Sequence, residues 1–279
     1  MPLNPARPGQ AEALVARGLD PDMVETADVI GALGALEDML AAERRADGGI
    51  SLLLARQALH DRVLLAMLGV QTAFAALDCE DERGDRLRGQ LQRIDARRTR
   101  NLGLANVLIG AATAVAAGGL SIGGLANASD IAGIIGGSAG AAAGGMVLFA
   151  TTSGTLRTHT NLLDEVWRQP EESALFPPTV WRYLTRRDAP GQPNLADEIK
   201  QEWIDAGLVD DEDGNHALVF SSDGVFTIDD LERRDAMLQL LEARVTLMSR
   251  DLRLLLEAIV ARPAVAMPAA RQARGARAP

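Results

Sequence analysis

The stretch that decides the fold covers residues 101–156 and reads NLGLANVLIGAATAVAAGGLSIGGLANASDIAGIIGGSAGAAAGGMVLFATTSGTL. Its single formal charge is Asp130, so residues 102–129 form one uncharged run and residues 131–156 form a second. The hydrocarbon core of a bilayer is about 30 Å thick, and roughly 20 apolar residues cross it as a helix. Each run is therefore long enough to span a membrane. The polar residues Asn127, Ser129 and Asp130 predict a turn between the two runs.

Glycine and alanine dominate both runs, and the glycines recur at four-residue intervals. Residues four apart lie on one face of a helix, so these glycines predict grooves in which two helices approach closely. We expect a helical hairpin of the glycine-zipper type, with Asn127 and Asp130 at its tip. The glycines expected to pack within it are Gly110, Gly119, Gly123, Gly133, Gly136, Gly137, Gly140, Gly144 and Gly145. The alternative is a Gly/Ala-rich hairpin buried inside a soluble helical bundle or oligomer.

Arginines stand at both outer ends of the stretch. Arg97, Arg98 and Arg100 precede it, and Arg157 follows it. Positive side chains beside an apolar segment are typical of the surface of a membrane. These four arginines are therefore predicted to be interfacial.

Three aromatic residues follow the stretch, namely Trp167, Trp181 and Tyr183. Tryptophan and tyrosine are enriched at membrane interfaces, so these side chains are candidates for interfacial anchors. The alternative is that they pin a loop to the helical body.

The whole chain has 279 residues, 3% aromatic residues and a net charge of −10. Scarce aromatics with abundant small residues favour close helix packing over a β-sandwich. The negative charge argues against nucleic acid as a partner. Cys79 is the only cysteine, which excludes an internal disulfide and a cysteine-based metal cluster.

Ahead of the stretch we expect a flexible N-terminus over residues 1–19 and helices over residues 20–100. Asp20 followed by Pro21 predicts a helix start, and this helix should end near Ala46. Residues 51–100 contain no proline and predict one long helix that continues into the hairpin. Its charged residues 79–88 predict a solvated crossing point. Its apolar face is expected at Leu59, Val63, Met67, Val70, Phe74, Leu77, Leu87, Leu91 and Ile94.

Beyond the stretch, residues 157–193 are expected to form a returning helix, continuous with the second arm, and a loop rich in proline and aromatic residues. Residues 194–262 predict a helix capped by Asn194 and Asp197, a small β-hairpin around Asp223-Gly224, and a C-terminal helix. Residues 217–220 and 225–228 are the expected strands. Alternating spacings of three and four predict a coiled-coil seam along Leu238, Leu241, Val245, Met248, Leu252, Leu255 and Ile259. The seam can pair with the 51–100 helix or with another subunit. Residues 263–279 are expected to form a disordered tail.

Catalytic patterns do not emerge from the sequence. His60, His159 and His216 lack metal-ligand spacing, and the acidic residues 210–214 do not fit a calcium-binding loop. The glycines contain no phosphate-binding motif, and their surroundings are apolar. We therefore expect no enzyme activity, no cofactor and no metal.

Two resemblances concern the order of these elements and two short segments. A long helix, a Gly/Ala-rich hydrophobic hairpin and a returning helix, over roughly residues 51–170, resemble the architecture of α-helical pore-forming toxins. The segments NLGLAN at residues 101–106 and PPTVWRYL at residues 177–184 are similar to uncharacterised bacterial envelope proteins. The second resemblance implies no known activity, and neither resemblance assigns a functional residue.

The sequence thus predicts a mainly α protein, an elongated helical bundle or coiled coil that carries a hydrophobic hairpin (residues 101–156) and a small β-hairpin. Its expected partners are a lipid bilayer and further copies of itself. It would act in a bacterial membrane or cell envelope, where it forms a pore or a membrane-anchored scaffold. Two alternatives remain: a pore-forming toxin or effector that is soluble until triggered, and a soluble scaffold whose hairpin is buried between subunits.

Overall fold

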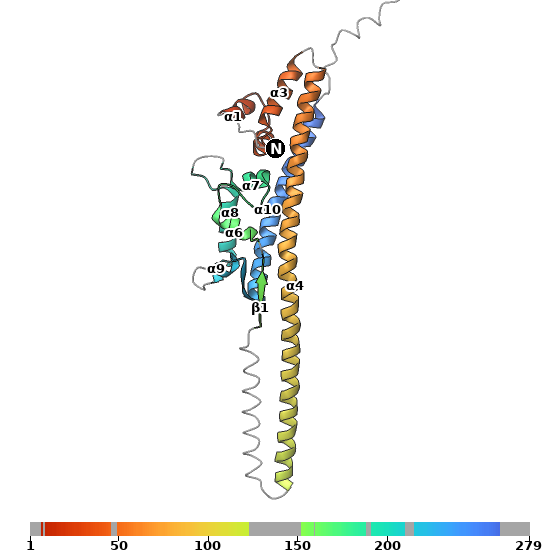
Figure 1. Ribbon diagram of the computed structural model, residues 1–279, viewed down its shortest axis with the longest axis vertical. Coiled ribbons are helices and arrows are strands. Elements are labelled where there is room, and N and C mark those ends of the chain that lie inside the picture. Colours follow the sequence, from red (N-terminus) through yellow and green to blue (C-terminus); the bar gives the residue numbers. More distant parts are fainter. Residues whose placement is uncertain are drawn as a thin grey trace, which may run out of the picture. The chain divides into compact units, whose positions relative to one another are not determined.

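In the computed structural model, the described residues are 7, 9–45, 49–122, 152–158, 160–187, 191–209 and 215–262. Within them the chain is mainly helical and carries one two-stranded antiparallel sheet, which confirms the predicted fold class (Figure 1). The helices are α1 (Gln10–Val15), α2 (Pro21–Val29), α3 (Leu33–Arg44), α4 (Ile50–Ile122), α6 (Leu162–Arg168), α7 (Pro178–Thr185), α8 (Leu195–Asp205), α9 (Asn215–Val219) and α10 (Ile228–Ala261). The strands are β1 (Ser153–Arg157) and β2 (Asp223–Thr227).

The chain divides into two compact units, each assembled from segments that are distant in the sequence. Unit 1 consists of Met1–Glu80, Thr160–Asp213 and Ala236–Pro279. Unit 2 consists of Asp81–His159 and Gly214–Asp235. Helices α4 and α10 each contribute residues to both units.

The N-terminal helices of unit 1 differ from the predicted single helix. Asp20 caps α2 as expected, because its side chain accepts hydrogen bonds from the backbone N–H groups of Asp22 and Met23. The chain then breaks at Gly31, whose φ of 66° glycine adopts more readily than other residues, and α3 follows. Residues 10–15 are helical rather than flexible, and Leu14 is buried.

Helix α4 confirms the prediction of one long helix that runs into the uncharged stretch. It begins at Ile50 and continues without a break to Ile122. In the 50–80 segment, the buried apolar side chains are Leu52, Leu59, Val63, Ala66, Val70, Ala73 and Leu77. Two positions expected on the apolar face are instead exposed, Met67 by 41% and Ile94 by 53%.

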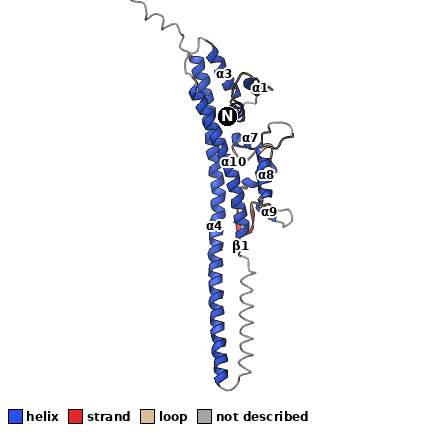
Figure 2. Ribbon diagram, turned by 180° about the vertical axis from the view of Figure 1, so that it is seen from behind, coloured by secondary structure: helices blue, strands red, loops and turns tan. Residues whose placement is uncertain are grey.

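Helix α10 lies alongside α4 in unit 1 (Figures 1 and 2). All seven predicted seam residues are at most 3% exposed. The guanidinium of Arg56 on α4 donates to the carbonyl oxygen of Arg262 at 2.8 Å, which ties the two helices together near the end of α10. The seam was predicted to pair either with the 51–100 helix or with another subunit. Its residues are buried within the chain itself, where α10 lies alongside α4.

The return from the stretch is a strand rather than the predicted helix. Residues 153–157 form β1, and the helix starts only at Leu162, where Asn161 caps α6. Leu156, Leu162, Leu163 and Val166 are buried. The segment expected to be an aromatic loop is partly helical, because Pro178 occupies the first turn of α7.

Helix α8 confirms the local capping prediction. Asn194 and Asp197 exchange side-chain and backbone hydrogen bonds in a capping box, and Gly207 follows the helix with φ 64°. The predicted hairpin between residues 217–220 and 225–228 is wrong. Residues 215–219 form α9, and β2 pairs with β1 instead.

Candidate functional site: the base of the uncharged stretch

The two ends of the uncharged stretch come together in unit 2. Helix α4 leads into the stretch at Asn101, and the chain is described again at Thr152. The hydroxyl of Thr152 donates to Oδ1 of Asp95 over 3.1 Å. The chain therefore leaves and returns at one place, as a hairpin requires.

Strand pairing fixes the returning chain. β1 and β2, the red strands of Figure 2, are antiparallel. Gly154 lies opposite Phe226, and Leu156 lies opposite Gly224. Beyond the ladder, the backbone N–H of Thr158 donates to the carbonyl oxygen of Ser222 at 2.7 Å. The return is thus held by backbone hydrogen bonds.

A small apolar core holds this sheet against α4. Its buried members are Leu91, Leu156, Phe226 and Leu231. At Gly154 the strand approaches the helix so closely that an added Cβ would lie 2.8 Å from Leu87 Cδ1. Burial of large apolar side chains contributes about 1.5–3 kcal/mol each, so this core stabilises the closed base.

The base is positively charged on α4. Arg97, Arg98 and Arg100 are exposed there, and Arg93 one turn earlier is exposed as well. Arg157 on β1 is also exposed and lies 3.8 Å from Asp223. Four exposed arginines therefore lie within two turns of helix, directly before the uncharged run.

Of the glycines predicted to pack within the hairpin, two lie in the described part of the chain. Gly110 and Gly119 lie on the helical backbone of α4. The remaining predicted hairpin residues lie outside the described part of the chain: Gly123, Asn127, Asp130, Gly133, Gly136, Gly137, Gly140, Gly144 and Gly145.

The three aromatic candidates lie in the helical body of unit 1. Trp181 is 4% exposed, stacks on Phe176 and donates from Nε1 to the carbonyl oxygen of Pro170 at 3.1 Å. Trp167 is half-buried with Lys200 over its ring, and Tyr183 donates to Asp251. These contacts match the packing interpretation rather than the interfacial one.

An acidic cluster that sequence reasoning missed joins α4 to α10 in unit 2. The carboxylate oxygens of Asp81, Asp85 and Asp235 lie within 4.8 Å of one another. Arg88 forms ion pairs with Asp85 and, at 3.0 Å, with Asp235. This guanidinium already supplies the counter-charge, so the cluster is better suited to an ion-pair network than to a metal. The predicted solvated crossing over residues 79–88 is therefore partly wrong.

Within this cluster, Asp81 is the carboxyl with the strongest change in acidity. Burial raises its pKa to about 6, and the hydrogen bond and negative charge of Asp235 act in the same direction. Oδ1 of Asp81 is buried without a hydrogen-bond partner among the described residues, which accounts for the cost of charging it.

A second apolar face runs along α4 in unit 1, on the side of the helix opposite its buried apolar residues. Its large side chains are 48–74% exposed: Ile50, Leu53, Leu54, Leu64, Leu65 and Leu68. We call this set the outer face of α4. Exposed apolar patches on helices mark interaction surfaces, with protein or with lipid.

By length and composition alone, one described helical segment could cross a membrane. It covers Ile50–Asn101, and a third of its most apolar window, with mean hydropathy 1.5, is buried in the protein. The buried core helix of a soluble protein meets the same criterion. This segment is distinct from the predicted hairpin, of whose residues it includes only Asn101.

Comparisons with protein families, curated proteins and solved structures find no match to this chain.

Proposed function

We propose that this chain is a membrane-anchored, self-associating scaffold in which residues 101–151 insert into a bilayer as a helical hairpin. The observation that carries the proposal is the closed base, where Thr152 bonds to Asp95 beside four exposed arginines. A segment that leaves and returns at one point can enter a bilayer while the rest of the chain stays on one side. The role is one of anchoring and assembly rather than catalysis.

Helix length agrees with this proposal. The uncharged part of α4, residues 101–122, spans about 32 Å at 1.5 Å per residue. This span equals the thickness of a bilayer hydrocarbon core, about 30 Å. The arginines at 97, 98 and 100 would then stand at the headgroups, where positive side chains are favourable.

Chain length also permits a second arm. From Asp95 to Ile122, α4 rises about 40 Å, and the chain must cover that distance again to reach Thr152. The 29 residues from 123 to 151 would span about 44 Å as a helix. A helical return with a short turn therefore fits the available chain.

Self-association is supported by the outer face of α4. Molecules anchored in one bilayer share a common orientation, so this face would stand at the same height in each copy. Confinement of the copies to a surface raises their effective concentration. A parallel contact through Leu64, Leu65 and Leu68 would remove these side chains from water.

The test replaces residues 102–149 by a short Gly/Ser linker. Because Asp95 and Thr152 are already in contact, the linker leaves both ends of the stretch in place. We expect the full-length chain in the membrane fraction and the linker variant in the soluble fraction. Unchanged helix content and an unchanged thermal transition of the body would confirm that the variant folds.

A matched control exchanges residues 102–149 for a leucine-rich hairpin of the same length. This variant should return to the membrane, because apolar length rather than particular glycines drives insertion. Full-length protein that is soluble without detergent would refute the anchor and favour the alternative of a hairpin buried between subunits.

A further inference from the structure

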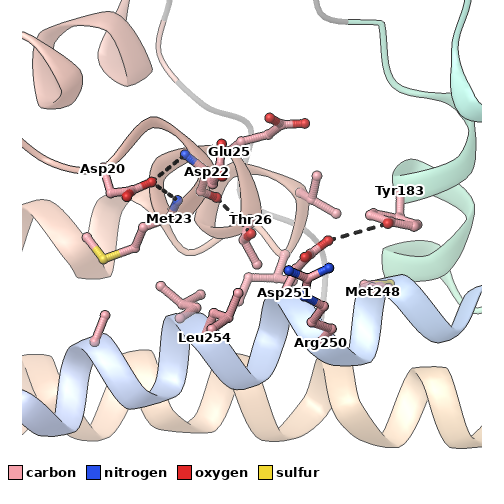
Figure 3. Close-up of a pocket in the computed structure, with 14 residues that line it drawn as sticks. Asp20, Asp22, Met23, Glu25, Thr26, Tyr183, Met248, Arg250, Asp251 and Leu254 are labelled. Atoms are coloured by element: carbon pink, nitrogen blue, oxygen red, sulfur yellow. Dashed lines mark hydrogen bonds between the residues drawn. The ribbon is translucent and has the colours of Figure 1, made fainter.

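Unit 1 contains a cleft of about 580 Å³ that the proposed anchoring does not use. Its walls come from α2, α7 and the C-terminal half of α10 (Figure 3). Apolar side chains such as Ile30, Leu254 and Leu255 contribute to its lining. A cleft of this size accommodates a few side chains of a peptide.

The rim of the cleft is acidic. Asp20, Asp22, Glu25 and Asp251 line it, and among the described residues Arg250 is the only basic one in the lining. Asp20 caps α2, Asp22 stands on the first turn of that helix, and Glu25 lies 3.5 Å from Arg186 in an ion pair (Figure 3). Such a rim favours a ligand that carries several positive charges.

Asp251 is a half-buried carboxylate in the lining of the cleft. Tyr183 Oη donates to its Oδ2 at 3.4 Å, as Figure 3 shows. Burial raises the pKa of Asp251, an effect that the hydrogen bond from Tyr183 and the charge of Arg250 partly oppose. A guanidinium bound here would gain a charge-assisted hydrogen bond to a carboxylate that is partly removed from water.

The chain itself carries a segment of matching chemistry, which follows α10 in the sequence. Residues 263–279 read PAVAMPAARQARGARAP and contain three arginines, no acidic residue, and the apolar residues Val265 and Met267. We propose that this segment binds in the cleft, with its arginines on the acidic rim and its apolar residues against the lining of α10.

Reach supports this assignment. Arg262 is fixed in unit 1, because its Nε lies 3.1 Å from Glu43 and its carbonyl oxygen accepts from Arg56. Ala258 and Leu254 of the cleft lie about 6–12 Å back along α10. Arg271 follows Arg262 by nine residues, which extend to about 30 Å. The segment can therefore fold back to the rim, at the high effective concentration of a tethered ligand.

The test measures tryptic cleavage after Arg271, Arg274 and Arg277 in the purified full-length chain. In the cleft variant, Asp22→Asn, Glu25→Gln and Asp251→Asn remove three negative charges at nearly constant shape. We expect about tenfold faster cleavage, which corresponds to about 1.4 kcal/mol of docking. Salt at 0.5 M should accelerate cleavage in the unchanged chain, after correction for its effect on trypsin with a free peptide.

The matched control removes three exposed acidic charges of unit 1 that do not line the cleft, by Glu171→Gln, Glu172→Gln and Glu198→Gln. It should leave the cleavage rate unchanged, and the thermal transitions of both variants should show that they fold. Equal rates in the cleft variant and the unchanged chain would overturn the proposal. Equal acceleration in the control would also overturn it, because net charge alone would then explain the effect.

Discussion

At the scale of single residues, the surroundings of Asp81 in unit 2 change its acidity. Its pKa of about 6, against 3.8 for an ordinary aspartate, means that the native state binds a proton more readily than the unfolded chain. The stabilisation from this proton is complete below pH 3.8 and is lost as the pH rises through about 6. The groups that face it are Asp85 and Arg88 on α4 and Asp235 on α10.

Asp81→Asn should remove this pH dependence, because asparagine stays neutral and keeps a similar shape. We expect the variant to melt at a higher temperature than the unchanged chain at pH 7 and at the same temperature at pH 4. Thermal unfolding followed by circular dichroism between pH 4 and 7 measures the difference. Asp78→Asn changes an exposed acid one turn earlier and should reproduce the unchanged chain. Parallel curves for Asp81→Asn and the unchanged chain would contradict the assignment.

Two glycines of unit 2 should respond in opposite ways to alanine. A Cβ at Gly224 would press on the Leu218 side chain and lie 3.2 Å from Cε2 of the buried Phe226, so Gly224→Ala should lower stability by about 1–3 kcal/mol through overpacking. Gly89 on α4 has open space around the same position. Gly89→Ala should raise stability by about 0.5–1 kcal/mol, because alanine favours a helix. Denaturant unfolding compares the two, and equal effects would contradict the described sheet geometry.

Among the elements, α10 carries the clearest test of packing. Leu252 is fully buried in the seam. Truncation of a buried leucine lowers the free energy of unfolding by about 2–5 kcal/mol, and Leu252→Asp should lower it by at least as much. Arg253 beside it is exposed and pairs with Glu257, so Arg253→Ala should cost about 0.5 kcal/mol or less. Melting temperatures of the two variants give the comparison. A Leu252→Asp protein that melts like the unchanged chain would mean that the seam faces solvent.

Patterns confined to one element were predictable from the sequence. The capping box of Asn194 and Asp197 and the heptads of α10 depend on residues within a turn or two, and both are present. The strand pairing was not predictable, because β1 and β2 lie far apart in the chain and each strand supplies the backbone hydrogen-bond partners of the other. Residues 217–219 are β-prone, yet they form α9, where Leu218 packs on the core of unit 2.

The candidate site was predictable in part for the same reason. Charge and length alone indicated an apolar stretch flanked by arginines. The contact of Thr152 with Asp95, which closes the base, depends on a tertiary fold that spacing does not encode. The acidic cluster was missed because Asp235 comes from a distant helix. Trp181 was ambiguous because its residue type suits both a membrane interface and a buried site, and only its burial decides between them.

At the scale of the whole molecule, the outer face of α4 should determine assembly without affecting folding. Leu65→Gln with Leu68→Gln places polar groups on side chains that are already exposed, so thermal stability should stay within about 0.5 kcal/mol. We expect the oligomer to dissociate, as measured by light scattering in detergent. Gln71→Ala, on an exposed neighbour, should leave the size unchanged. A double variant of native size would assign this face to another role.

A second assembly test concerns the glycines of the stretch. Gly140→Leu, or Gly137→Leu beside it, adds a side chain where backbones are predicted to touch, at about 1–3 kcal/mol per site. Helix content should persist while the oligomer breaks, as seen by circular dichroism and size in detergent. Gly140→Ala serves as the mild control. An assembly of native size with leucine at either position would contradict the zipper hypothesis.

The closed base also bears on how such a chain would reach its membrane. If the stretch inserts as proposed, the contact between Asp95 and Thr152 means that the folded parts on either side of it would not have to cross the bilayer. Only the middle of the stretch, around Asn127 and Asp130, would cross to the far side. Unit 1 and the part of unit 2 outside the stretch could then fold before insertion, and the N- and C-terminal regions would lie in the same compartment.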